Sequence, residues 1–381
     1  MPIVAFATLL AALVAVAVLA LGSAAGAKVN TSKALDAALD EVMDAQGAPP
    51  GLSVLLQRGN DVEFRRRGVS NLKTDAPMRG RQHYRIASMA KAFSGAVALG
   101  LASDGKLKLS DTIGDWIPKL LPKAQDVTVA QALQHTAGLA DYIRQQEFID
   151  VLLEDPAQYL SPRELLSFVE DEELEFKPGS RYEYSDTDNI VVGLIVEEAS
   201  GKSYEKLLQQ YVYRPAGLTR TSLPRTVEMP TPYIHGYDLS EDEPPFDTSE
   251  VINPAGAWAS GGIVSTPRDI NDFFRAYVGR ELFNRKIAKS QNDYVVGSSQ
   301  PPGPGRNQAT LGLFRYKTRC GTVYGHTGSF PGYRAMAIST LNGKRSLVFT
   351  VNSQIVPGQG SQEASDLIRF AQEDAVCHLL R

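Results

Sequence analysis

The chain has 381 residues, of which 43% are hydrophobic and 22% are charged, as is usual for a soluble globular protein. Its net charge of −4 provides no surplus of basic side chains, so neither nucleic acid nor an anionic membrane surface is an expected partner. A chain of this length can bury a large core without a metal or a disulfide framework, and we expect one large domain or two closely joined ones.

The first 27 residues differ from the rest of the chain. They carry no charge, residues 9–21 are continuous Ala, Val and Leu, and Ala25-Gly26-Ala27 fits the small-residue pattern of a signal-peptide cleavage site. We therefore predict a secretory signal over residues 1–27. The alternative is an uncleaved membrane anchor, because residues 3–21 are nearly long enough to span a bilayer. In both cases residues 28–381 are expected to be exported, either periplasmic or secreted.

The first half of the remaining chain begins with strands and then becomes helical. Hydrophobic periodicity and turn residues predict a helix over 33–45 and strands over 51–57 and 62–67. Residues 89–103 are apolar on all sides, which is typical of a buried helix. Residues 111–250 are mostly helical by pattern, and an acidic segment with two prolines at 241–247 is expected to be an exposed loop.

The strand pattern returns near the C-terminus. A segment rich in Pro and Gly at 298–308 is expected to be a second exposed loop. Three strands and a final helix follow, over 323–326, 333–340, 347–352 and 363–380. Strands at both ends of the chain predict an α+β fold, with one antiparallel sheet formed from about 28–110 and 251–381 and a mostly helical region inserted at about 111–250.

Four Ser-x-x-Lys pairs occur, so this pattern is weak by itself. They begin at Ser70, Ser88, Ser103 and Ser203. Only Ser88 opens a buried apolar helix, where residues three apart share a face, so Lys91 is expected one turn from the Ser88 hydroxyl. Apolar surroundings favour an uncharged amine, which makes Lys91 a candidate base and Ser88 a candidate nucleophile. The structural alternative is a capping serine beside a lysine that extends to the surface.

Two further patterns carry groups suited to catalysis. Tyr184-Ser185-Asp186 precedes an apolar helix, and a phenol near a lysine can lose its proton and act as a base. A turn with an Asx cap is the alternative interpretation. His326-Thr327-Gly328 lies in a predicted strand, where its glycine and Gly325 would allow another backbone or a ligand to come close. A histidine in a strand is also common as a structural residue.

The chain contains two cysteines, Cys320 and Cys377. An even number of cysteines in an exported protein indicates a disulfide, here between the start of a late strand and the last helix. Two unrelated buried thiols are the alternative.

Taken in chain order, these patterns are typical of one family. Ser-x-x-Lys on a buried helix, Tyr-x-Asn in a helical region and Lys- or His-Thr-Gly on a late strand are the signature of penicillin-binding proteins and serine β-lactamases. Over residues 30–380 the chain resembles the group of class C β-lactamases and D-alanyl-D-alanine carboxypeptidases. Supporting segments are Leu-Gln-His-Thr-Ala-Gly-Leu at 133–139 and Ser-Gly-Gly-Ile-Val-Ser-Thr at 260–266. The His-Thr-Gly triplet and the cysteine pair most resemble an exported Streptomyces DD-peptidase.

The resemblance implies an acyl-enzyme at Ser88, with the base and acid roles shared by Lys91 and Tyr184. The backbone N–H groups of Ser88 and Ser329 would form the oxyanion hole. It also implies a substrate-binding set of Asp186, His326, Thr327 and Gly328, in which the histidine replaces a cation. No metal or cofactor is implied. The expected substrate is a small molecule or peptide, namely a D-amino-acid peptide, a β-lactam or an ester.

Two positions depart from the family pattern. Asp186 stands where relatives carry Asn, and a carboxylate only accepts hydrogen bonds, whereas an amide also donates them. Phe314 stands where the DD-peptidases of the most similar type carry an arginine for the terminal carboxylate of the substrate. Arg315 would point to the other face of its strand, and Arg334 is another candidate for that carboxylate.

Several functions therefore stay open. The leading expectation is a D-alanyl-D-alanine carboxypeptidase, and a β-lactamase or an esterase of the same family are alternatives. Asp186 favours a different class, a non-catalytic module that binds penicillin or peptidoglycan. A Ser-His-Asp triad is a weaker alternative, because no Gly-x-Ser-x-Gly elbow surrounds Ser88. A membrane is an expected partner only if the N-terminal segment stays uncleaved.

Overall fold

The computed structural model of the chain describes residues 30–239, 243–358 and 360–381, so the signal predicted at 1–27 lies outside the described residues. Within these ranges no helix combines the length and apolar character that crossing a bilayer requires.

Both ends of the chain contribute to one antiparallel sheet. In its strand order, β3-β2-β1-β13-β12-β11-β10-β9-β8, the N-terminal hairpin lies beside the last strand, and Leu52 pairs with Val351. The strands are β1 Gly51–Arg58, β2 Asp61–Asn71, β3 Ala76–Pro77, β8 Val295–Val296, β9 Arg306–Thr310, β10 Leu313–Thr318, β11 Gly321–Phe330, β12 Tyr333–Ser339 and β13 Arg345–Val351. The predicted α+β fold is confirmed.

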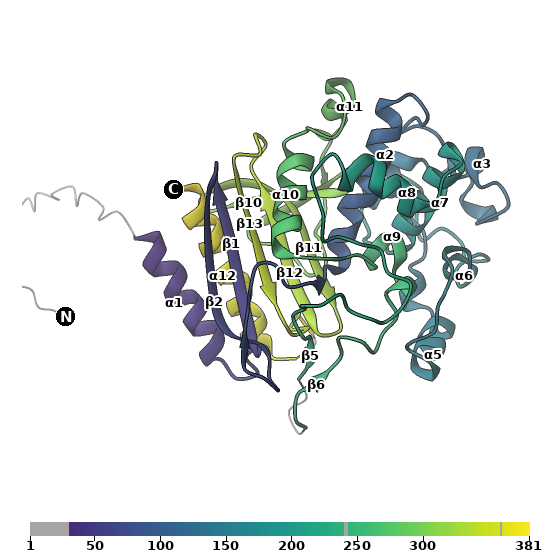
Figure 1. Cartoon of the computed structure of the whole chain (residues 1–381). Coiled ribbons are helices and arrows are strands. Elements are labelled where there is room, and N and C mark those ends of the chain that lie inside the picture. Colours follow the sequence, from purple (N-terminus) through teal and green to yellow (C-terminus); the bar gives the residue numbers. More distant parts are fainter. Residues whose placement is uncertain (1–29, 240–242, 359) are drawn as a thin grey trace, which may run out of the picture. The chain divides into compact units, whose positions relative to one another are not determined.

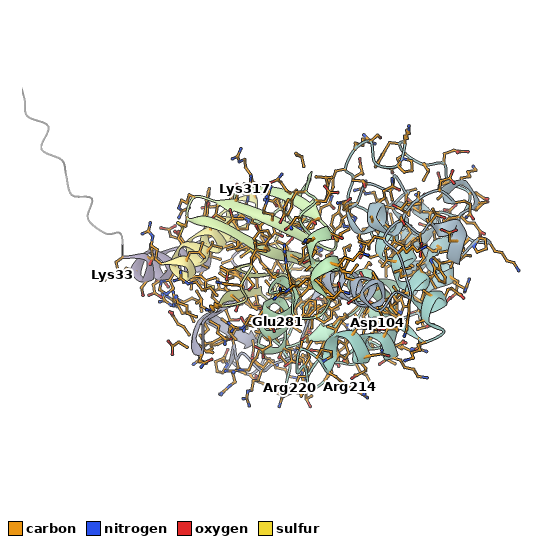
Figure 2. All side chains as sticks on the ribbon, turned by 90° about the horizontal axis from the view of Figure 1, so that it is seen from above. Lys33, Asp104, Arg214, Arg220, Glu281 and Lys317 are labelled. Atoms are coloured by element: carbon orange, nitrogen blue, oxygen red, sulfur yellow. A yellow bond between two sulfur atoms is a disulfide. The ribbon has the colours of Figure 1, made fainter. Side chains whose placement is uncertain are left out.

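Two terminal helices cover one face of this sheet (Figure 1). They are α1 Thr31–Asp44 and α12 Gln362–Leu380. Alternate residues of β1, namely Leu52, Val54 and Leu56, pack in the same cluster as the apolar stripes of both helices, as the period of two in a strand requires. Figure 2, seen from above, shows Lys33 on α1 next to α12 and on the far side of the sheet from Asp104, which follows α2.

The other face packs against a larger, mostly helical layer. Its central helix is α2 Ala90–Ser103, which is buried along most of its length, as its apolar sequence predicts. Around it lie α3 Ile113–Trp116, α4 Val129–Leu133, α5 Gln146–Glu154, α6 Pro162–Ser167, α7 Thr187–Ser200, α8 Tyr204–Leu208, α9 Trp258–Gly261, α10 Pro267–Val278 and α11 Arg285–Ser290. Short strand pairs join β4 Tyr84–Arg85 to β7 Val264–Ser265, and β5 Tyr237–Asp238 to β6 Phe246–Asp247.

The segment at 298–308 differs from the exposed loop that its Pro and Gly content predicts. Ser299, Pro301 and Gly303 are buried, and residues 306–308 begin strand β9. Backbone oxygens of the segment accept hydrogen bonds from Thr327 and Arg369, so tertiary contacts hold it against β11 and α12. The C-terminal strands therefore begin with β8, β9 and β10, before the strand predicted at 323–326. By contrast, residues 243–247 are exposed as expected, while 241 and 242 lie outside the described residues.

The disulfide between Cys320 and Cys377 is formed, with 5.1 Å between the two Cα atoms. It links the turn before β11 to the last turns of α12. The prediction of one bridge between these elements is confirmed.

Candidate functional site

Ser88 lies in a short 3₁₀ turn, η1 Ala87–Met89, that leads directly into α2. The residue before it, Ala87, has a φ of 52°, in the left-handed region that non-glycine residues seldom adopt. Such strain is often found at functional sites. The η1 turn places Ser88 at the N-terminus of a buried helix, where the helix dipole stabilises negative charge that develops during a reaction.

The Lys91 amine is fully buried one turn further on, and three oxygen atoms surround it. Its Nζ lies 3.2 Å from Ser88 Oγ, 2.7 Å from Asp186 Oδ1 and 3.0 Å from the carbonyl oxygen of Ser260. Helical spacing predicted the first of these contacts. The second joins residues 95 positions apart in the sequence. The pairing of Asp186 with Lys91 therefore depends on the packing of α7 against α2.

Tyr184 is buried over the same lysine, with Nζ 4.9 Å from the centre of the phenol ring. Burial, followed by the negative charge of Asp186, raises the pKa of Tyr184 well above its usual value of 10, and the Ser88 hydroxyl acts in the opposite direction. The phenol therefore keeps its proton at neutral pH. This direction is opposite to the one expected from the sequence, because burial and the aspartate outweigh any effect of the amine.

A second carboxyl group lies behind Asp186. Asp141 is buried, and its Oδ1 accepts a hydrogen bond of 3.0 Å from the backbone N–H of Asp186. Burial, and then the Asp186 charge, raise the pKa of Asp141 to about 7. At neutral pH this group is therefore partly protonated, which limits the negative charge around the buried amine.

The strand triplet lies beside these groups and not in the cleft. His326 is fully buried, its Nδ1 contacts the carbonyl oxygen of Thr327, and burial lowers its pKa to about 3. The ring is therefore uncharged at neutral pH, so His326 does not provide the positive charge of the lysine found at this position in Lys-Thr-Gly. Gly328 has a clear steric role, because a Cβ there would lie 2.4 Å from the carbonyl oxygen of Ile86. This glycine allows β11 to pass close to η1.

An open cleft of about 270 Å³ contains the exposed part of the site. Ser88, Asp186 and Ser329 line it, and Gln354 donates a hydrogen bond to Ser329 Oγ. Its apolar wall comes from α5 and its flanks, from residue 252 and from the end of β11: Ile143, Phe148, Ile149, Val151, Leu152, Leu160, Ile252 and Phe330. The charged residues among the described lining are Asp155 and Asp186, and none is Lys, Arg or His.

The candidates for a carboxylate-binding cation lie elsewhere. Phe314 packs in the same apolar cluster as Tyr184. Arg315 stacks on Tyr294 at 3.7 Å, on the opposite face of β10 as predicted. Arg334, the other candidate, is buried and donates hydrogen bonds to backbone and side-chain oxygens at positions 355 and 365. It therefore does not serve the cleft.

A buried pair next to Tyr184 was not predicted from the sequence. His135 Nδ1 lies 2.8 Å from Asp188 Oδ2, and the imidazole packs on the phenol of Tyr184 with 4.5 Å between ring centres. Burial lowers the pKa of His135 and raises that of Asp188, so a neutral pair is favoured. The only sequence signal for this pair was the family-like segment at 133–139, which contains His135. Nothing near Asp188 in the sequence marks it as the partner of His135.

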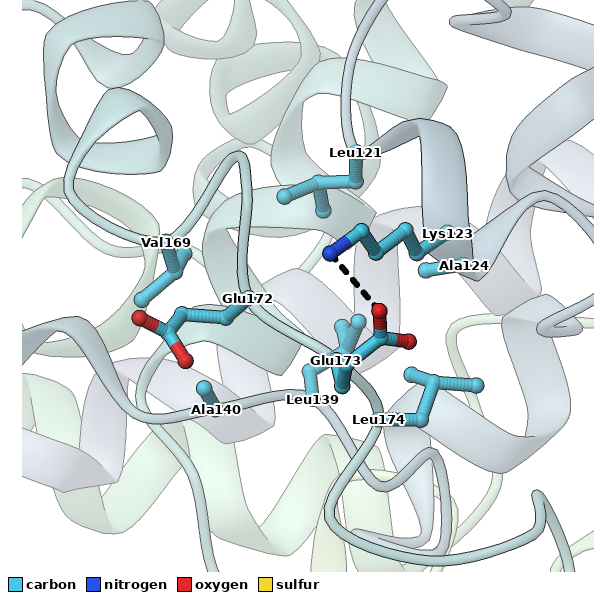
Figure 3. A pocket seen from close by; sticks show the side chains of 9 residues that line it. All are labelled: Leu121, Lys123, Ala124, Leu139, Ala140, Val169, Glu172, Glu173 and Leu174. Carbon is cyan, nitrogen blue, oxygen red and sulfur yellow. Dashed lines mark ion pairs between the residues drawn. The ribbon is translucent and has the colours of Figure 1, made fainter.

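Two other features carry no catalytic geometry. A hollow of about 10 Å³ between residues 121 and 174, with an ion pair of 2.7 Å between Lys123 and Glu173, is lined by nine residues (Figure 3). It holds about one water molecule and is too small for a substrate. The serines of two other Ser-x-x-Lys pairs have structural contacts, since Ser70 Oγ donates to the Ala76 carbonyl and Ser103 Oγ accepts from the Asn284 backbone.

Comparison with known proteins identifies the fold and the family of the chain. A D-stereospecific amidohydrolase from Streptomyces sp. has the same fold, with 28% identity and a TM-score of 0.75 over 89% of this chain and 97% of that one. The D-amino acid amidase of Ochrobactrum anthropi SV3, solved with L-phenylalanine amide, superposes with a TM-score of 0.79 at 24% identity, over 91% and 97% of the two chains. At that identity the second likeness concerns the fold.

Among curated proteins, penicillin-binding protein 4* of Bacillus subtilis is 23% identical over 338 residues, which cover 79% of this chain and 68% of the relative. The family model described as Beta-lactamase matches residues 35–372, which include all of the groups described above. The chain therefore belongs to the Beta-lactamase family.

Proposed function

We propose that the protein is a serine hydrolase in which Ser88 forms an acyl-enzyme with an amide or ester substrate. The observation that carries this proposal is the contact of 3.2 Å between Ser88 Oγ in the cleft and the buried Lys91 amine. Membership of the family supports the same chemistry. Tyr184, whose ring centre lies 4.9 Å from the same amine, supplies a second group able to move a proton.

Lys91 is placed to exchange a proton with Ser88. Its Nζ donates hydrogen bonds to Ser88 Oγ, to Asp186 Oδ1 and to the Ser260 carbonyl. Once one proton has left the amine, two N–H groups can still donate to Asp186 and Ser260 while the lone pair faces Ser88. Lys91 takes the Ser88 proton as Oγ attacks the substrate carbonyl carbon. The backbone N–H groups of Ser88 and Ser329 stabilise the negative charge that develops on the carbonyl oxygen. Both groups can reach this oxygen only because β11, which carries Ser329, passes close to η1, which carries Ser88.

Tyr184 then acts as the acid. Its phenol, kept protonated by burial, gives its proton to the leaving nitrogen or oxygen as the bond to the carbonyl carbon breaks. The resulting phenolate recovers a proton from the Lys91 ammonium, which restores both groups. In the second half-reaction a water molecule attacks the acyl carbon and its proton passes to Lys91. The bond from the acyl carbon to Ser88 Oγ then breaks, Lys91 returns the proton to Oγ, and the acyl group leaves as an acid.

The cleft favours a substrate whose leaving group is uncharged. A carboxypeptidase must hold the carboxylate of its departing amino acid, and no described lining residue of the cleft is a cation. His326 is neutral and Arg334 is committed to the backbone, so neither replaces the missing arginine. We therefore infer an amidase or esterase activity on substrates with an apolar side chain, which the wall around α5 would accommodate.

A D-alanyl-D-alanine carboxypeptidase is the second candidate, favoured by the likeness to penicillin-binding proteins. The experiment that separates the candidates is intact-protein mass spectrometry after incubation with a neutral fluorophosphonate and, separately, with benzylpenicillin. We expect a phosphonyl adduct on Ser88 that is lost in Ser88→Ala. It should be kept in Ser103→Ala, a matched change in another Ser-x-x-Lys pair.

The outcomes have distinct meanings. A persistent benzylpenicillin adduct would favour the carboxypeptidase, and rapid loss of the drug without an adduct would favour a β-lactamase. An unmodified protein in both incubations would contradict acylation at Ser88 and would favour the non-catalytic binding module.

We also propose that the protein is exported. The Cys320–Cys377 disulfide supports an oxidising compartment. N-terminal sequencing of the mature protein tests this, with Lys28 expected as the first residue if the segment is a signal. An intact N-terminus in the membrane fraction would support an anchor.

A further inference from the structure

Asp186 has one oxygen atom that is free to meet a substrate. Its Oδ1 accepts the Lys91 hydrogen bond and its backbone N–H donates to Asp141, so one contact holds the side chain and another holds the backbone of the residue. Among the described residues, the other oxygen, Oδ2, has no hydrogen-bond partner. The side chain lines the cleft beside Ser88 and keeps 13% of its surface exposed. Oδ2 is therefore the acceptor that remains available there.

A carboxylate at this position reverses the polarity of recognition. The amide of an asparagine can donate a hydrogen bond to a carbonyl oxygen of a substrate, whereas a carboxylate only accepts. An acylated nitrogen that presents its carbonyl oxygen to Asp186 would meet repulsion in place of a hydrogen bond. A protonated amine would instead form a charge-assisted hydrogen bond, which is about twice as strong as a neutral one.

The distances suit an amine on the carbon next to the scissile carbonyl. Ser88 Oγ and Asp186 Oδ1 both contact the same Lys91 Nζ atom, so the nucleophile and the carboxylate lie side by side. In an amino acid derivative, the α-nitrogen lies about 2.5 Å from the carbonyl carbon. A carbonyl carbon placed for attack by Ser88 thus brings the α-nitrogen toward Asp186.

The surroundings favour a cation at the same place. Asp155 is the other charged residue of the described cleft lining, and Asp141 lies directly behind Asp186. Lys91 is the basic side chain in contact with Asp186, and it is fully buried and engages Oδ1 only. Arg144, beside Asp141, is 49% exposed and also contacts Glu183. No described lining residue of the cleft is basic, so none lies on the side of the carboxylate that a bound ammonium group would meet.

We propose that Asp186 selects substrates with a free, protonated α-amine, namely amino acid amides and esters, and discriminates against their N-acylated counterparts. This inference rests on the proposed function and names the substrate class of the same cleft. The apolar wall formed by α5 and the end of β11 would take the side chain of that amino acid.

The test compares matched pairs of substrates. Hydrolysis of phenylalanine p-nitroanilide and N-acetylphenylalanine p-nitroanilide, each as the D and the L enantiomer, gives a ratio of kcat/KM between free and acylated amine. We expect a ratio of at least about 30 for the enzyme, as one lost charge-assisted hydrogen bond predicts. In Asp186→Asn the ratio should fall at least tenfold. Any change in the strength of Lys91 as a base affects both substrates and cancels in the ratio.

Asp150→Asn is the matched control, because Asp150 is an exposed aspartate on α5 outside the cleft lining. Its ratio should equal that of the unmodified enzyme. An equal or inverted preference in the unmodified enzyme, or an Asp186→Asn ratio that does not change, would overturn the proposal.

A binding measurement keeps this inference separate from the proposed function. The affinities of Ser88→Ala for phenylalanine amide and N-acetylphenylalanine amide, by calorimetry, should differ in the same direction without any turnover. Selective binding of the amine without acylation of Ser88 would contradict only the proposed hydrolase function. Turnover that depends on Ser88 but ignores the amine would contradict this inference alone, and the absence of both would contradict both.

Discussion

The buried carboxyl group of Asp141 should make the protein less stable as the pH rises. In the unfolded chain an aspartate has a pKa of 3.8, and in the folded protein burial and the neighbouring Asp186 raise the pKa of Asp141 to about 7. Between these values the folded state binds more protons than the unfolded state. The stabilising effect of this protonation is therefore complete below pH 3.8 and is lost as the pH rises through 7.

Asp141→Asn measures the free energy of folding that is lost when Asp141 ionises, because an amide does not ionise. The difference between 3.8 and about 7, at 1.36 kcal/mol for each pKa unit, corresponds to about 4 kcal/mol at pH 8. The asparagine oxygen can still accept the Asp186 backbone N–H, so that contact is kept. The lost contact with Arg144, at 3.7 Å on a side chain that is 49% exposed, costs less than about 1 kcal/mol.

The assay is urea unfolding of the protein and of Asp141→Asn at pH 4 and pH 8, with Asp150→Asn as the exposed control. Relative to the unmodified protein, the free energy of unfolding of Asp141→Asn should rise by up to about 4 kcal/mol more at pH 8 than at pH 4. That of Asp150→Asn should differ from the unmodified protein by the same small amount at both pH values. An equal effect of Asp141→Asn at the two pH values would refute the reasoning, because it would mean that the carboxyl group ionises at no cost in the fold.

Three further predictions concern the proposed acid Tyr184, strand β11 and the disulfide. Tyr184→Phe should keep the fold but lower kcat by about 10²- to 10⁴-fold in steady-state hydrolysis, more for an anilide than for a p-nitrophenyl ester, whose leaving group needs no proton; equal losses would contradict the acid role. Gly328→Ala should lower kcat by about 10²-fold or more, because its Cβ would meet the Ile86 carbonyl and displace the strand that carries Ser329 of the proposed oxyanion hole; a fully active variant would contradict that proposal. Replacing Cys320 and Cys377 by serine should lower the free energy of unfolding by about 4 kcal/mol for a loop of 57 residues, and an unchanged urea midpoint would show that the bridge adds no stability.

Local sequence was sufficient for the elements that form the framework. The helices at 31–44, 90–103 and 362–380 and the strands at 51–58 and 345–351 agree with their predicted limits to within two residues, because hydrophobic periodicity directly reflects which face is buried. The one-turn contact between Ser88 and Lys91 was predictable for the same reason, since it depends only on helix geometry.

Contacts between distant segments could not be predicted in this way. Nothing local to the segment at 298–308 shows that it packs on β11, and its Pro and Gly residues favour a loop wherever it lies. The partnership of His135 with Asp188 and the position of Asp141 behind Asp186 likewise join separate elements. Such pairs are specified by the packing of helices around α2, which a pattern within one segment does not contain.

The sequence by itself determined the family, the α+β sheet, the disulfide partners and the candidates for the catalytic residues, because motif order and periodicity are properties of the chain. Only the tertiary structure decided their protonation. Burial keeps the proton on Tyr184 and off His326, and a raised pKa leaves Asp141 partly neutral. These directions depend on how much water each group loses and on which charges become its neighbours, and both are fixed only when the helical layer closes over the sheet.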